Sequence, residues 1–64
     1  MTLSTPVEDS LREAQSNLRN ALAYAARTES PYTTKHIAEM LSKIEAIIDA
    51  EELLTKIELS LIHI

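Results

Sequence analysis

The stretch "TESPYTT", residues 28–34, separates two long segments with helical periodicity. Pro31 biases Ser30 before it toward an extended conformation, which interrupts a helix. Thr33 is a good N-cap for a helix that follows. We therefore predict that one helix ends near Thr28 and that a second begins at residue 33. A connection of about five residues suits two antiparallel helices, so the predicted fold is all-α, an antiparallel helical hairpin.

The first helix is predicted over residues 5–28. It opens with "TPVE", in which Thr5 suits the N-cap, Pro6 suits the first helical position and Glu8 completes a capping box. Apolar residues then follow at alternating spacings of four and three, which is the pattern of a helix with one apolar face. This face comprises Val7, Leu11, Ala14, Leu18, Ala21, Leu22 and Ala25.

The second helix is predicted over residues 33–62 and is the more apolar of the two. Tyr32 and Ile37 have the spacing of a hydrophobic staple at its start. Its predicted seam contains Ile37, Met40, Ile44, Ile47, Ala50, Leu54, Ile57, Leu61 and Ile64, and Leu41, Ile48 and Leu53 widen it.

Two alternatives concern the end of the second helix. The segment "DAEE", residues 49–52, has the form of a capping box and could start a third helix at Asp49. In residues 57–64, "IELSLIHI", apolar and polar side chains alternate between Ile57 and Leu61, as they do in a strand. The continuous helical spacing across both segments favours a single long helix.

The length and composition of the chain favour self-association. A single domain covering residues 1–64 buries only about 60% of its unfolded surface and is marginally stable alone. The sequence contains no Cys and no Gly, which excludes disulfides and Cys-based zinc sites and disfavours β-rich folds with tight turns. Among the usual supplements of a small domain, which are disulfides, a metal or a partner subunit, we therefore expect a partner subunit.

The second helix offers more apolar surface than the first can cover. By the rise of an α-helix the two span roughly 45 Å and 33 Å, so about two turns of the second have no intramolecular partner. We expect Leu41, Ile48, Leu53 and the C-terminal segment to be left exposed and to dock on a second copy, most simply in a dimeric four-helix bundle, or on another protein. The predicted oligomer interface comprises Ile44, Ile48, Leu54, Ile57, Leu61 and Ile64.

The net charge of −4 disfavours nucleic acid and anionic membranes as partners, because both require a clustered positive field. Arg12 and Arg19 lie seven residues apart and share a helix face, which makes them the candidate nucleic-acid contacts. In length and layout the chain resembles the Rop-type RNA-binding helical hairpins. No motif of that family is matched residue by residue, so none of its functional residues carries over.

Motifs that could support catalysis or metal binding are weak. His36 and Glu39 reverse the order of the Glu-x-x-His pair of di-iron bundles, and His63 is interpreted as a surface or interface residue. The acidic side chains of residues 49–58 are interpreted as a solvated face, and Tyr24 and Tyr32 as covering the connection. No nucleophile–base set or Gly-rich phosphate loop is found, so we expect no enzymatic activity and no cofactor.

The sequence contains no signal-peptide pattern and no apolar stretch long enough for a transmembrane helix. With the absence of Cys, this leads us to expect a cytoplasmic protein. The function expected from the sequence is a small non-catalytic protein–protein interaction module, a regulator, adaptor or assembly factor, that acts as a homo-oligomer. The alternative is a Rop-like nucleic-acid-binding regulator.

Overall fold

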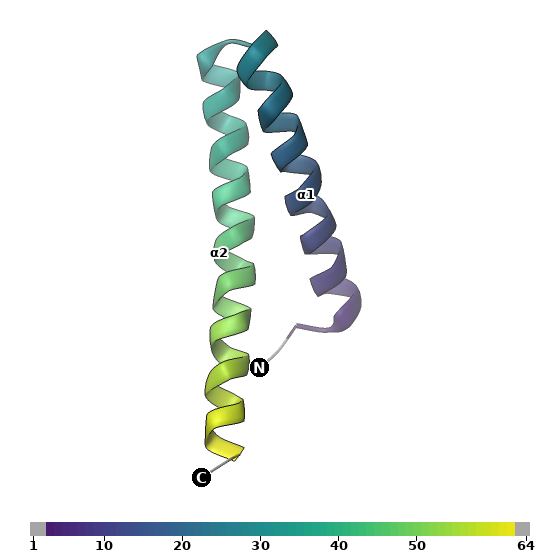
Figure 1. Cartoon of the computed structure of the whole chain (residues 1–64), viewed down its shortest axis with the longest axis vertical. Helices are drawn as coiled ribbons and strands as arrows, with labels where there is room; N and C mark the ends of the chain where they lie inside the picture. The colour runs from purple at the N-terminus through teal and green to yellow at the C-terminus, as the bar shows by residue number, and fades with distance from the viewer. Residues whose placement is uncertain (1–2, 63–64) are drawn as a thin grey trace.

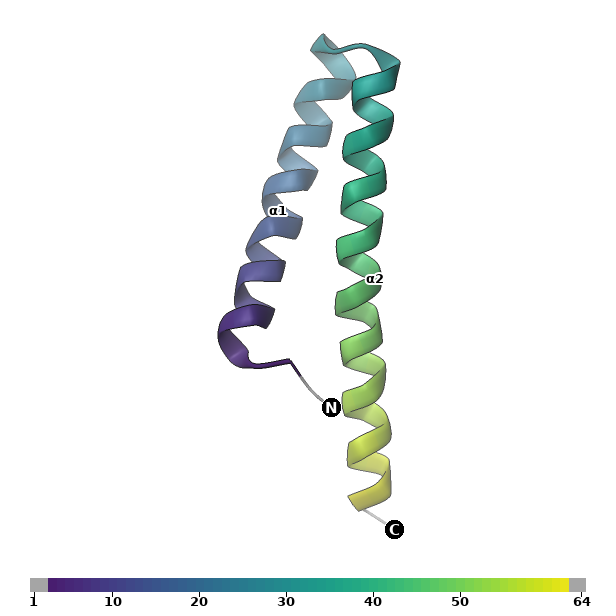
Figure 2. The same ribbon diagram turned by 180° about the vertical axis from the view of Figure 1, so that it is seen from behind.

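A computed structural model describes residues 3–62 as two α-helices joined by a short connection (Figure 1). Helix α1 spans Thr5–Thr28 and helix α2 spans Pro31–Ile62. The helices run antiparallel and pack on each other, so the predicted all-α helical hairpin is confirmed. In both views they lie closest near the connection and diverge toward the termini (Figures 1 and 2).

The connection is shorter than predicted, because α2 begins at Pro31 and leaves only Glu29 and Ser30 between the helices. Both residues suit a turn without glycine: Glu29 is extended, with φ −107° and ψ 167°, and Ser30 precedes a proline. The Ser30 Oγ accepts a hydrogen bond from the Thr33 backbone N–H at 3.4 Å. Ser30 therefore takes the capping role that the sequence assigned to Thr33, and Pro31 occupies the first helical position.

Backbone and hydroxyl contacts hold the connection against the end of α1. The Ala25 carbonyl accepts hydrogen bonds from the Glu29 N–H at 2.9 Å and from the Thr34 Oγ at 3.2 Å. Tyr32, which was predicted to staple onto Ile37, instead packs edge-on against the His36 ring, with ring centroids 4.4 Å apart. The predicted staple is absent because α2 starts before Tyr32 and places it one turn from His36.

The start of α1 also differs from the prediction. Ser4, not Thr5, is the N-cap, and its side chain makes no capping hydrogen bond. Glu8 does not reach back to the cap, because its carboxylate accepts hydrogen bonds from Arg12 at 3.3 Å. The predicted capping box is therefore wrong, although the helix limits of 5–28 are correct.

Helix α2 runs without a break through residues 49–62. The third helix starting at Asp49 and the strand over the C-terminal segment are both wrong for the part of the chain that is described. Ile64 and His63 lie outside the described residues. At 32 residues against 24, α2 is longer than α1 by about 12 Å, and its last turns extend beyond the start of α1 (Figure 1).

The core between the helices is very small. Its buried apolar residues are Ala25, Leu41 and Ile48, and among the described residues no side chain falls below 2% exposure. The hairpin measures 52 × 19 × 13 Å, so it is about one helix thick. A single layer of two helices cannot enclose a core, because each helix has only one neighbour.

Candidate functional site

Helix α2 carries two apolar rows on different faces. The first faces α1 and is called the inner row here; it comprises Ile37, Leu41, Ile44 and Ile48, which are buried or half-buried. The second faces solvent and is called the outer seam; it comprises Met40, Ile47, Ala50, Leu54, Ile57 and Leu61, all of them exposed. The helical repeat places the centre of the outer seam roughly 130° around α2 from Ile48.

Two adjacent isoleucines show the difference between these faces. Ile48 is 4% exposed, whereas Ile47 is 47% exposed. The expectation that a lone hairpin leaves Leu41 and Ile48 exposed is therefore wrong for both residues. They pack against the apolar face of α1, whose Leu11, Leu18 and Leu22 are half-buried. Leu53, at 59% exposure, is exposed as expected.

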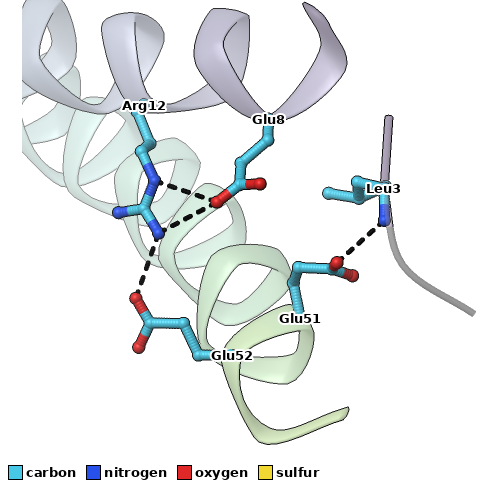
Figure 3. Close-up of polar contacts among 5 residues, drawn as sticks. All are labelled: Leu3, Glu8, Arg12, Glu51 and Glu52. Atoms are coloured by element: carbon cyan, nitrogen blue, oxygen red, sulfur yellow. Dashed lines mark hydrogen bonds and ion pairs between the residues drawn. The ribbon is translucent and has the colours of Figure 1, made fainter. Parts of the chain in front are cut away.

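The inner face of α2 becomes polar beyond Ile48. Glu51, Thr55 and Glu58 occupy the next positions on that face, and Glu51 is 8% exposed. One Glu51 oxygen accepts a hydrogen bond from the Leu3 backbone N–H at 2.8 Å (Figure 3). The interpretation of this acidic segment as a wholly solvated face is wrong for Glu51. The apolar side of the C-terminal third of α2 thus points away from α1.

The predicted interface residues divide between the two faces. Leu54, Ile57 and Leu61 belong to the outer seam, whereas Ile44, which is half-buried, and Ile48, which lies in the core, belong to the inner row. Their participation in an oligomer interface stays a prediction. Sequence analysis placed Met40 and Ile47 in the seam of the second helix but left them out of the predicted interface. The available signal was that Met40, Ile47, Leu54 and Leu61 recur every seven residues.

The two candidate nucleic-acid contacts are both paired with carboxylates. Arg12 lies between Glu8, at 3.3 Å, and Glu52, at 3.1 Å (Figure 3). Both hydrogen bonds raise the pKa of the Arg12 guanidinium, and the bond to Glu52 has the larger effect. Arg19 contacts Glu45 at 2.7 Å. An anionic ligand would have to compete with these carboxylates for both guanidinium groups.

Arg19 and Gln15 together form a polar contact between the helices at Glu45. Gln15 donates a hydrogen bond to Glu45 at 3.1 Å. The pKa of Glu45 lies below its ordinary value of 4.5. The hydrogen bond from Arg19 is the largest cause of this lowering, and the hydrogen bond from Gln15 is the second. A carboxylate with a lowered pKa stabilises the folded state above its unfolded pKa, and the stabilisation is lost as pH falls through the folded pKa.

We therefore expect Glu45→Gln to lower the thermal midpoint at neutral pH, and its effect to shrink as the pH falls through the lowered pKa of Glu45, because the wild-type carboxylate then becomes protonated as well. Circular dichroism melts of both proteins over this range measure the difference. The control is Glu13→Gln, which removes an exposed carboxylate on α1. A Glu45→Gln effect that does not shrink as the carboxylates of the protein are titrated with acid would show that the charge of Glu45 does not contribute.

His36 and Glu39 face each other across one helical turn, with Nδ1 and Oε2 3.9 Å apart. Within residues 3–62, no three His, Asp or Glu side chains are grouped so that they could hold a metal ion. Neither helix, over the same residues, combines the length and apolarity needed to cross a membrane.

The outer seam is an exposed apolar surface that the packing of the hairpin itself does not use. Comparison with known proteins does not assign it a role: the chain matches no protein-family model, no curated protein and no solved structure.

Proposed function

We propose that this protein is a small non-catalytic interaction module, a regulator, adaptor or assembly factor, that acts as a homo-oligomer. The hairpin self-associates, most simply as a dimeric four-helix bundle. The observation that supports this proposal is the contrast, among the described residues, between a core of three apolar residues and an outer seam whose large side chains are between 42% and 66% exposed.

The energetics of small domains support the same proposal. Complete burial of a Leu, Ile or Met side chain stabilises a fold by about 1.5–3 kcal/mol. The outer seam contains five such residues, more than the core does. Contiguous exposed apolar surface of this kind marks an interaction site on soluble proteins. Association would therefore bury more large apolar side chains than the hairpin buries by itself.

A nucleic-acid-binding role is less well supported, because Arg12 and Arg19 are paired with glutamates of α2 and α1. Guanidinium groups that are already paired are less available for phosphate neutralisation. The interaction module is thus the preferred proposal, with the seam on α2 as its binding surface.

Sedimentation velocity over about 1–100 µM protein, a range that covers binding free energies near −8 kcal/mol, tests the proposal. We expect a species of twice the 7.2 kDa chain mass, with its fraction rising with concentration. A well-folded monomer throughout this range, with full helical circular dichroism, would contradict the proposal.

A further inference from the structure

We propose that the occupant of the outer seam is a second copy of this chain, packed antiparallel with α2 against α2 around a two-fold axis beside Ala50. This inference rests on the proposed function and specifies the surface, the orientation and the register of the association. The surface area, the charge distribution and the spacing of the seam residues each support it.

The contact between copies runs through α2, because α1 has no second apolar row. On the described part of α1 the exposed large apolar side chains are Val7 and Tyr24, near opposite ends of the helix. Two isolated side chains do not form a continuous surface. The outer seam, in contrast, extends from Met40 to Leu61 along one side of α2, which is roughly 32 Å of helix.

The surface of the chain exceeds that of a compact monomer by about the area that one interface requires. The accessible surface is 5045 Å² for 7.2 kDa, whereas a compact monomer of this mass exposes about 4,100 Å². The excess of about 900 Å² is close to the roughly 800 Å² that each partner buries in a standard interface. One additional copy is enough to account for it.

The charge distribution favours the antiparallel orientation. Residues 14–48, the half of the hairpin with the connection, carry four basic and three acidic side chains, a net charge of +1. The other half, residues 1–13 and 49–64, carries two basic and seven acidic side chains, a net charge of −5. Parallel packing would bring the two acidic halves together, whereas antiparallel packing brings opposite signs together. The macrodipoles of two antiparallel helices also attract.

The seam spacing defines the register. Met40, Ile47, Leu54 and Leu61 repeat every seven residues, as the core positions of paired helices do. In an antiparallel pair, position 40 of one copy lies opposite position 61 of the other, and position 47 lies opposite position 54. This register pairs all four residues across the interface, and it places the two-fold axis beside Ala50. A small side chain at the axis allows the two helices to approach closely. The same register places Ile57 opposite Ile44, the half-buried residue at the edge of the inner row.

Disulfide trapping tests this arrangement, because the chain contains no Cys and each introduced thiol is unique. Met40→Cys and Leu61→Cys proteins are mixed in equal amounts with oxidised glutathione, and the products are identified by mass. We expect the mixed 40–61 disulfide in about tenfold excess over either self-disulfide, because a disulfide requires Cα atoms closer than about 7 Å. In the proposed dimer the two copies of position 40 are roughly 32 Å apart.

Ile47→Cys mixed with Leu54→Cys provides a second pair nearer the axis, in case a substitution near the end of the helix weakens the fold. A predominant 40–40 or 47–47 disulfide would show parallel packing and overturn this inference while leaving self-association intact. If the protein sediments as a dimer but forms neither mixed disulfide, the two copies meet on another surface. That result would also overturn this inference and leave self-association intact. A wild-type chain that sediments as a folded monomer would overturn both this inference and the proposed function.

Discussion

Replacing Ile48 by alanine is expected to lower the thermal midpoint by at least about 10 °C, or to abolish cooperative folding. Ile48 is 4% exposed and is one of three buried apolar residues in the described part of the chain. A buried Ile→Ala substitution costs about 2–5 kcal/mol, whereas a domain of this length is stable by only about 3–10 kcal/mol. Thermal and urea melts followed by circular dichroism measure the loss.

The adjacent residue provides a matched control. Ile47→Ala removes the same atoms from the same helix, but from a side chain that is 47% exposed. At dilutions where the protein is monomeric, the Ile47 variant should melt like the wild type, and the Ile48 variant should melt lower at every concentration. Equal destabilisation by the two substitutions in the monomer would contradict the assignment of the inner row as the core.

The hairpin could be predicted from the sequence because its determinants are local. A proline between two helical periods places a turn near residues 28–34, and that turn is present. The limits of α2 differ by two residues at its start because Thr33 and Ser30 are both acceptable caps. Only the geometry of the connection, with extended Glu29 and Ser30, favours the earlier one.

The face of α2 that packs against α1 could not be read from periodicity. The apolar residues of the inner row, within 37–48, and those of the outer seam, within 40–61, both recur at spacings of three and four. One helix therefore carries two overlapping apolar rows. The sequence prediction merged them and assigned Leu41 and Ile48 to the exposed side. The overlooked signal was the polarity that follows each row: the row of Ile37, Leu41, Ile44 and Ile48 continues into Glu51 and Thr55, whereas the other row stays apolar as far as Leu61.

Contacts between the helices were equally inaccessible. Arg12 and Glu52 are 40 residues apart in the chain, and Arg19 and Glu45 are 26 apart. Only the antiparallel register brings each pair together. Arg12 and Arg19 could therefore be interpreted as free cations on a polar face, although in the structure both contribute to the contact between the helices.

Replacing both Leu54 and Ile57 by glutamine is expected to weaken self-association by at least about 100-fold, which corresponds to roughly 2.7 kcal/mol. In a symmetric dimer each substitution removes two apolar side chains from the interface. On dimerisation each of these side chains would bury about half of its surface, which stabilises the dimer by about 1 kcal/mol per side chain. Glutamine is a good helix former, so α2 itself should persist. Sedimentation equilibrium gives the dissociation constant, and circular dichroism gives the helix content.

Leu59→Gln is the control for this variant, because it makes the same chemical change in the same region but outside the outer seam. Leu59 is 51% exposed, and the helical repeat places it on the side of α2 that faces α1, beyond the start of that helix. A seam-specific interface predicts less than about a fivefold change for Leu59→Gln, or roughly 1 kcal/mol. If Leu59→Gln weakened association as strongly as the double substitution, general apolarity of the C-terminal segment, and not the seam, would drive association.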